Sequence, residues 1–329
     1  MKAVISIFDN RYSKLYDVSQ LVDKIQWDTY LEDQPGKCTL SVKKTGALAF
    51  WEGASISVVI DSVNVFKGYV FTKKRTKNTD IIEVVCYDQL RYLKNKDSYV
   101  FKNLTSSQIF SKICDDFVLK YKVVDASTHI CAKRANDGTA LYEMIQTALD
   151  DTLINTKEWY IIRDNFGILE HININSLKTG LILGDKSSVS DFDYTSSIDN
   201  DVYNQIKLYR DNKDTGKREL YIVNDTINGG KNLKEWGILQ YYAKVDDSLN
   251  AAQIEQRAKG LLSLYNNVSR TLKLKDCLGD FRIFAGTSFR CKIEDLGDIT
   301  LDLNLLVNQC SHRIENEMHL MDIDVEVVI

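Results

Sequence analysis

Three side chains near the end of the sequence, Cys310, His312 and His319, are of the types that bind metal ions. Residues two apart in a strand point to the same face, so we expect Cys310 and His312 to lie side by side. A structural zinc ion takes four ligands, and no fourth ligand is evident in the sequence. Polar groups at the end of a strand are the favoured interpretation, and the sequence predicts no metal and no cofactor.

Other side chains have the chemistry of hydrolases. Cys86 and Cys114 would serve cysteine–histidine catalysis, but both lie in apolar periodic segments, where a thiol behaves as a small core side chain. The pairs at 115–116 and 150–151 are adjacent aspartates, and glycoside hydrolysis needs two carboxylates at a defined separation. They fall near helix ends, so solvated polar faces explain them better.

Two further stretches carry glycine or charge. Residues 180–188 have the glycines and lysine of a phosphate loop, but no glycine directly precedes Lys186, so we expect a plain loop. The basic stretch 73–77 has no interleaved aromatic residue, which favours a solvated loop over an anionic partner surface. His129 and His171 have no identifiable partner. Since the HExxH, GxSxG and CxxC patterns are absent, the chain is predicted not to be an enzyme.

The composition is that of a folded protein with a sizeable core. The 329 residues are 44% hydrophobic and carry a formal net charge of −4, which gives no reason to expect a membrane or a sequence-specific nucleic acid as partner. The seven cysteines are odd in number and scattered, which is typical of free thiols in a cytosol. The apolar runs are strand-sized, well short of the roughly 20 residues of a membrane helix.

The first part of the chain reads as closely spaced strands, and the middle part changes to helical periodicity. Residues 54–61, 63–71 and 81–87 are rich in Val, Ile, Phe and Tyr and are separated by turn residues. Helices are expected after the N-cap residues at 105–107 and again after 137–138. A hairpin follows, with a turn at 164–167 in which Gly167 is expected to adopt a positive φ.

Strands return in the last part of the chain, with one helix among them. Segments 202–210 and 217–224 flank a polar turn at 211–216, and the apolar stripe at 251–265 predicts a helix beginning near Asn250. Strands are expected at 287–294, near 305–313 and at 320–328. In the last of these, Met321, Ile323, Val325 and Val327 share one face, which we expect to be the interior.

The predicted fold class is α+β and mostly β, with two antiparallel β-barrel domains flanking a small α+β module. The expected boundaries are 1–98 for the N-terminal barrel, 99–186 for the central module, and 187–329 for a C-terminal barrel with one inserted helix.

An ordered set of short segments resembles the XkdQ/YqbQ family of phage tail proteins, within the wider class of tail hub proteins that includes late control protein D. The set comprises VVCYDQLRYLKN at 84–95, TSSQI at 105–109, ALYEMIQTAL at 140–149, YTSSI at 194–198, NQIKLY at 204–209, EWGILQ at 235–240, IFAG at 283–286, SHRI at 311–314 and HLM at 319–321. No segment is specific alone, but their order and spacing match over most of the chain. The motif positions with a structural or interface role are expected to be Tyr87, Asp88, Leu93, Thr105, Ser197, Ile198, Asn204, Trp236, Gly237, Gly286, His312, His319 and Met321.

The resemblance implies a structural hub in the baseplate of a contractile tail. Such hubs are homotrimers in which each chain contributes two similar barrels, and three chains then present six roughly equivalent edges. The implied partners are further copies of the chain, the hexameric tail tube protein, the trimeric central spike and other baseplate subunits. The protein would be assembled in the bacterial cytoplasm and become part of a virion tail or of a phage-tail-like particle.

Two alternatives remain open at the level of sequence. One is a tail-associated enzyme that degrades peptidoglycan, although we expect any wall hydrolase to be a separate subunit. The other is a receptor-binding or secretion-system module on the same scaffold. The sequence also leaves open whether the particle is a phage or an empty-tail bacteriocin.

Overall fold

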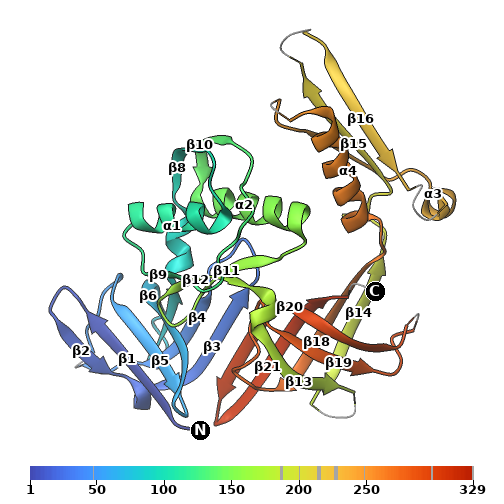
Figure 1. The fold of residues 1–329 in the computed structure, drawn as a ribbon. Coiled ribbons are helices and arrows are strands. Elements are labelled where there is room, and N and C mark those ends of the chain that lie inside the picture. Colours follow the sequence, from blue (N-terminus) through green and yellow to red (C-terminus); the bar gives the residue numbers. More distant parts are fainter. Residues whose placement is uncertain are drawn as a thin grey trace. The chain divides into compact units, whose positions relative to one another are not determined.

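A computed structural model gives the fold of residues 1–329 and describes all of them except 47, 186, 187, 200, 213–215, 226–228, 248, 298, 328 and 329 (Figure 1). The chain forms two compact units. The main unit consists of Met1–Thr152, Glu158–Asp193 and Leu272–Glu326, and the inserted unit consists of Leu153–Lys157, Tyr194–Thr271 and Val327–Ile329. Neither unit coincides with a predicted domain, and the boundaries at 98 and 186 stay predictions.

Seven strands form the N-terminal part of the main unit. They are β1 (Ala3–Asp9), β2 (Lys14–Asp17), β3 (Val22–Tyr30), β4 (Lys37–Lys43), β5 (Ser55–Ile60), β6 (Val63–Arg75) and β7 (Ile81–Tyr87), with a 3-10 turn η1 (Ser19–Leu21) between β2 and β3. In β4 and β5 every second residue is buried, as period-two patterning requires. The predicted strands β5, β6 and β7 are confirmed, with β6 running to Arg75 rather than ending at residue 71.

The C-terminal strands continue the same sheet. They are β13 (Lys178–Gly184), β14 (Asp191–Ser197), β18 (Ser269–Leu278), β19 (Ser288–Ile293), β20 (Leu301–Glu315) and β21 (Met318–Glu326). The strand order is β14-β18-β21-β20-β3-β4-β7-β6-β5-β1-β2, and β19 joins β13 to β20. Strand β20 pairs antiparallel with β3, from Gln309 opposite Tyr30 to Glu315 opposite Lys24.

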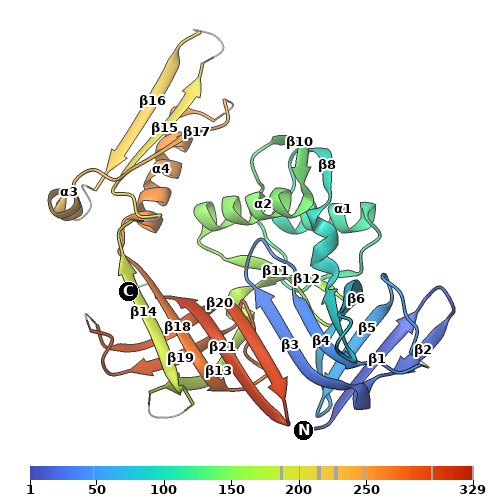
Figure 2. The same ribbon diagram turned by 180° about the vertical axis from the view of Figure 1, so that it is seen from behind.

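The mostly β character of the prediction is confirmed, but the two separate barrels are not. Among the described residues the pairings join thirteen strands in one sheet, eleven of them along one open path, and this sheet contains both the N-terminal and the C-terminal strands. The ribbon views show β3 and β20 side by side from both directions (Figures 1 and 2). No helix in the part of the chain that the structure describes is long and apolar enough to cross a membrane.

A helical module follows β7 along the chain. Its elements are η2 (Gln89–Lys94), β8 (Lys96–Phe101), α1 (Ser106–Asp116), β9 (Tyr121–Val123), β10 (Arg134–Ala140), α2 (Leu141–Thr156), β11 (Tyr160–Asp164), β12 (Leu169–Asn173) and η3 (Ile174–Leu177). Thr105 caps α1 in a reciprocal capping box with Gln108, as the N-cap prediction required. The predicted hairpin is confirmed, because β11 and β12 pair antiparallel and Gly167 in their turn has φ +84°. Phe166 in the same turn has φ +52°.

The inserted unit is a three-stranded sheet covered by a helix. Its elements are β15 (Gln205–Asp211), β16 (Arg218–Asn224), α3 (Lys231–Trp236), β17 (Gln240–Lys244) and α4 (Ala251–Tyr265), with the strand order β16-β15-β17. Helix α4 begins at a capping box formed by Asn250 and Gln253 and buries Ile254 and Ala258 against the sheet. The prediction of one helix here was incomplete because it missed α3, and residues 213–215 of the predicted turn lie outside the described part.

Strand β21 shows the predicted alternation. Met321, Ile323, Val325 and Val327 are at most 2% exposed. Asp322 and Asp324 occupy the opposite face and form ion pairs there. Val328, which the prediction placed at the end of this strand, lies outside the described residues.

Candidate assembly surface

The His312 side chain lies at the centre of a buried hydrogen-bond chain between β20 and β21. Its Nε2 is 2.8 Å from the carbonyl oxygen of Ile283, and its Nδ1 is 2.8 Å from Nε2 of His319. A carbonyl oxygen only accepts, so Nε2 of His312 carries the proton and its Nδ1 accepts a hydrogen bond from His319. Burial is the main reason that the pKa of His312 falls to about 3, so the ring is neutral.

Cys310 and His312 do share a face, as predicted, with Sγ 3.3 Å from Nε2. Both ring nitrogens of His312 are already engaged, however, by a carbonyl group and by the second histidine. Within the described residues no group of three or more His, Cys, Asp or Glu side chains is arranged to hold a metal ion. The three side chains form a structural cluster in which Cys310 and His312 are buried and His319 is half-buried. The His312 ring also stacks on Trp27 at a centroid distance of 4.9 Å.

The hydrolase candidates do not assemble a catalytic geometry. Burial raises the pKa of the Cys86 thiol, and it raises that of Cys114 to about 12, which disfavours a nucleophilic thiolate. Asp116 accepts hydrogen bonds from Tyr99 and Lys112 at the surface. The prediction that Asp151 is solvated was wrong.

Asp151 instead anchors the segment that leads into β10. It is 3% exposed and lies 3.4 Å from Nε2 of His129 and 3.7 Å from the Arg134 guanidinium. Its carboxylate also accepts a hydrogen bond from the Ala132 amide at 3.0 Å. His129, for which the sequence offered no partner, therefore pairs with a carboxylate from helix α2.

Sequence reasoning missed a serine–histidine pair in the central module. Ser106 Oγ lies 3.2 Å from Nε2 of His171, and Nδ1 of His171 lies 2.8 Å from the carbonyl oxygen of Asp125. A serine nucleophile and its histidine base are hydrogen-bonded in the same sequence, from the hydroxyl to one ring nitrogen and from the other ring nitrogen to an orienting group. Ser106 and His171 are both fully buried, however, and Ser106 is also bonded to Ser127 at 2.7 Å. The pair fixes the start of α1 on β12, and its two members are 65 positions apart, so no local pattern in the sequence indicates the contact.

Asp88 joins the N-terminal strands to the central module. Its carboxylate caps η2 by accepting from the Leu90 amide at 3.0 Å, and it accepts from the Gly36 amide at 2.9 Å. The next residue, Gln89, donates to the Gly167 carbonyl at 2.6 Å. Burial, and then the neighbouring carboxylate of Asp164, raise the pKa of Asp88, and burial raises that of Asp164 to about 6.

Asn204 has a comparable role in the inserted unit. Its side-chain amide donates to the carbonyls of Asn232 and Gly237 at 3.2 and 2.7 Å, and its oxygen accepts from the Leu239 amide at 2.9 Å. Trp236 ends α3, and Gly237 follows with φ +73°, a conformation that favours glycine. The EWGILQ motif therefore closes the loop from α3 to β17.

The remaining motif positions also have structural roles, in tight packing, in capping or in the hydrophobic core. Gly286 has φ +92° and leaves no room for a side chain, since a Cβ atom would come within 2.3 Å of Ile161. Ser197 and Ile198 lie at the end of β14, where Ser197 Oγ accepts from the Asp199 amide. Leu93 and Met321 are fully buried, Thr105 caps α1, and Tyr87 packs edge-on against Phe71. An interface role for any of the thirteen stays a prediction.

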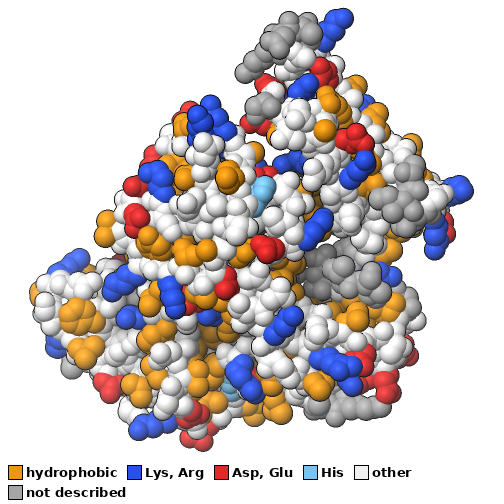
Figure 3. Space-filling model, viewed as in Figure 1, with side chains coloured by type: hydrophobic (Ala, Val, Ile, Leu, Met, Phe, Trp, Pro, Cys, Tyr) orange, Lys and Arg blue, Asp and Glu red, His pale blue; other side chains and the backbone are white. Residues whose placement is uncertain are grey.

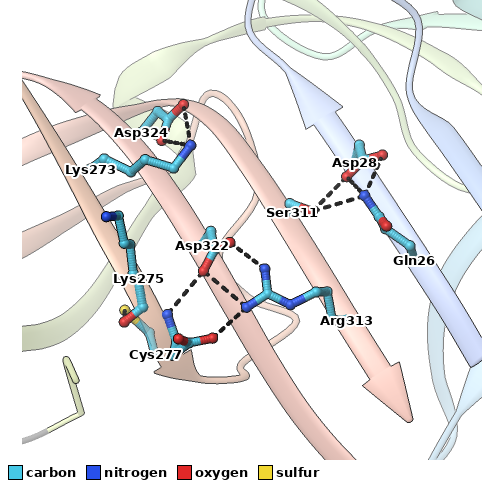
Figure 4. A network of polar contacts seen from close by, with 10 residues as sticks. Gln26, Asp28, Lys273, Lys275, Cys277, Ser311, Arg313, Asp322 and Asp324 are labelled. Atoms are coloured by element: carbon cyan, nitrogen blue, oxygen red, sulfur yellow. Dashed lines mark hydrogen bonds and ion pairs between the residues drawn. The ribbon is translucent and has the colours of Figure 1, made fainter. Parts of the chain in front are cut away.

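A band of paired charges crosses the outer face of β18, β21, β20 and β3 (Figure 4). Arg313 bridges Asp322 and Asp276, and Lys273 pairs with Asp324 at 3.2 Å. Further along the band, Asp28 accepts from Ser311 at 2.6 Å and from Gln26 at 3.0 Å. The sheet thus presents a rigid polar face on one side and the apolar core on the other.

The rest of the surface is mixed. Figure 3 shows acidic and basic side chains interspersed with hydrophobic ones over the face in view. The basic stretch 73–77 is not wholly a loop as predicted, because Lys73 to Arg75 complete β6. The Lys73 ammonium donates to the Phe50 carbonyl at 2.5 Å and lies over the rings of Phe50 and Trp51. Lys73 therefore makes its contacts within the fold, whereas Lys74 and Arg75 are exposed.

Comparisons with known proteins agree with this architecture. The chain is 28% identical over 284 residues to the phage-like element PBSX protein XkdQ of Bacillus subtilis, covering 83% of this chain and 81% of XkdQ. The prophage MuSo2 43 kDa tail protein of Shewanella oneidensis has a similar fold, with a TM-score of 0.73 at 16% identity over 99% of this chain and 98% of that one.

A third similarity is to the E. coli c3393 protein. The TM-score is 0.55 at 10% identity, covering 94% of this chain and 73% of that one. That protein is described as a component of the type VI secretion system with structural similarity to the T4 bacteriophage tail proteins gp27 and gp5. The model of the YQBQ-like family matches residues 25–326, which include every strand from β4 to β21, and the chain therefore belongs to the YQBQ-like family.

Proposed function

We propose that this phage tail and baseplate-type structural protein is the hub of a contractile tail baseplate. In this role it forms a homotrimer that joins the hexameric tail tube to the trimeric central spike. It is assembled in the bacterial cytoplasm and then becomes part of a virion tail or a tail-like particle. It acts by positioning other subunits, not by catalysis.

The pairing of β3 with β20 carries this proposal. It places the N-terminal and C-terminal strand groups side by side in one main unit. Each chain then offers two groups of strands, and three chains arranged around a threefold axis offer six. A ring of that kind matches sixfold symmetry on one side and threefold symmetry on the other. The likeness to tail proteins over the whole chain supports the same role.

The unpaired edges of the sheet supply a way to join neighbouring subunits. Strand β2 ends the sheet on the N-terminal side, and β13 is bonded to β19 alone among the described strands. Unpaired strand edges are a liability in a monomer, but they pair readily with strands of a partner. In the proposed baseplate these edges are covered by the tube, by the spike or by other baseplate subunits.

Light scattering on the purified protein, alone and with its candidate spike, tests the proposal. We expect a mass about three times the 37.7 kDa of one chain, either for the protein alone or after the spike is added. A strict monomer that ignores the spike would contradict the hub. Peptidoglycan cleavage by that monomer would instead favour the alternative function, a wall-degrading enzyme of the same tail.

A further inference from the structure

The inserted unit leaves one face of its sheet uncovered. Helix α4 packs on the other face, where Ile206 and Leu208 of β15 are at most 1% exposed (Figure 2). On the uncovered face Leu220, Ile222 and Tyr242 are 51%, 54% and 50% exposed. Large apolar side chains gathered on an exposed face indicate an interaction surface.

The uncovered face is also cationic, and its side chains contact one another. Tyr209 and Tyr242 stack with a centroid distance of 5.0 Å, and the Arg218 guanidinium lies 4.2 Å above the Tyr209 ring. Lys207 lies over Tyr242, and Lys244 and Arg218 both pair with Asp211. Lys244 also pairs with Asp247, so three cations and two carboxylates give this face a charge of 3 − 2 = +1.

The band of charges on the main unit has the opposite sign. Around β18 and β21 it contains five carboxylates, those of Asp191, Asp193, Asp276, Asp322 and Asp324. They pair with three cations, Lys273, Lys275 and Arg313, so the charge is 3 − 5 = −2. Leu278 and Met318, which are 66% and 61% exposed, supply apolar side chains at the end of the same two strands.

We infer that the cationic face of the inserted unit binds the acidic band around β18 and β21 on a second copy of this chain. The charges of the two surfaces are complementary, and each carries exposed apolar side chains. Pairing of the cationic face with itself would bring like charges together, so a twofold contact is disfavoured. A contact between two different surfaces passes from copy to copy, and it forms a ring when the rotation between copies closes. The inference rests on the proposed trimer and identifies the contact that holds it together.

Charge reversal on the uncovered face tests the inference. In Lys207→Glu/Arg218→Glu we expect trimer association to weaken about 100-fold, measured by light scattering over a dilution series. The matched control is Lys231→Glu/Lys259→Glu, which reverses two exposed lysines on helices α3 and α4. The control should associate like the wild type. Circular dichroism melting shows whether each variant is folded.

A second pair of substitutions separates a lost contact from a damaged fold. Adding Asp191→Lys/Asp193→Lys to the reversed variant should strengthen its trimer association by at least about tenfold, because the two surfaces again carry opposite charges. In mixtures of isotopically light and heavy wild-type protein, an amine-reactive cross-linker should join Lys207 or Lys244 of one copy to Lys273 or Lys275 of another.

The outcomes distinguish this inference from the proposed function. A trimer that persists in the reversed variant, or cross-links between copies that avoid both surfaces, overturns the inference and leaves the hub standing. A wild-type chain that stays monomeric with the spike present overturns both. Lost association with no rescue and no such cross-links also counts against the inference.

Discussion

A buried position on β21 gives the sharpest test of the fold. Val325 is 2% exposed and lies directly opposite Val307, which is fully buried. Val325→Asp removes apolar burial that is worth about 1.5–3 kcal/mol and places a carboxylate in the buried core. We expect the free energy of unfolding to fall by about 5 kcal/mol at pH 7, a large share of the 5–15 kcal/mol typical of a domain.

The pH dependence of the same variant adds a second observable. Burial raises the pKa of the new carboxyl above its unfolded value, so the folded state binds more protons than the unfolded state at intermediate pH. The destabilisation therefore grows as the pH rises from 4 to 7. Val325→Ala, which lacks the charge, should cost about 2 kcal/mol at every pH.

Urea denaturation followed by circular dichroism measures both effects. Leu303→Asp on the neighbouring strand β20 serves as the control, because that side chain is 38% exposed and its replacement should change stability by less than about 1 kcal/mol. If Val325→Asp unfolded at the wild-type urea concentration, the register of β21 and the interior position of Val325 would both be wrong.

Three further predictions concern polar and glycine positions. Burial lowers the pKa of His312 to about 3 from the 6.5 that is usual for histidine, so the stability contributed by its neutral ring is complete above pH 6.5 and is lost as the pH falls toward 3. The urea midpoint should therefore drop between pH 7 and 5, and it should drop less in His312→Gln. Asp164→Asn removes the carboxylate that, after burial, raises the pKa of Asp88, so the pKa of Asp88 should fall when measured by carbon NMR, and an unchanged value would refute that contribution. Gly279→Ala would place a Cβ atom 2.1 Å from the His319 ring, so we expect a loss of about 2 kcal/mol in thermal unfolding. Gly46→Ala, which meets nothing within 4 Å, should be neutral, and equal melting of the two alanine variants would refute the close contact.

The sequence predicted the elements whose signal is local. Helices α1 and α4 have strong periodicity and capping residues at Thr105 and Asn250, so both were predicted near their true starts. Strand β3 was missed because its burial does not alternate: within Val22–Tyr30 only Ile25 and Asp28 are buried. That strand pairs with β20 on one side, and a pairing partner so far away in sequence leaves no local pattern.

The same distinction applies to the candidate chemistry. The spacing of two residues correctly placed Cys310 beside His312, because alternation along one strand is local. The hydrogen bond to His319 depends on the register of β20 with β21, and the pairing of Ser106 with His171 depends on the docking of α1 on β12. The predicted exposure of Asp151 failed for the same reason, since its partners come from another segment.

The pairing of β3 with β20 also sets the order of events during synthesis. The partners Tyr30 and Gln309 are 309 − 30 = 279 residues apart, and a ribosome makes about 5–20 residues per second. The edge of β3 therefore stays unpaired for on the order of 15–60 seconds, and during that time its backbone N–H and C=O groups can pair with other chains. A chain interrupted before β20 keeps that edge open and stays a substrate for chaperones and proteases. Formation of the β3–β20 pair thus requires that most of the chain has been made before a subunit can enter an assembly.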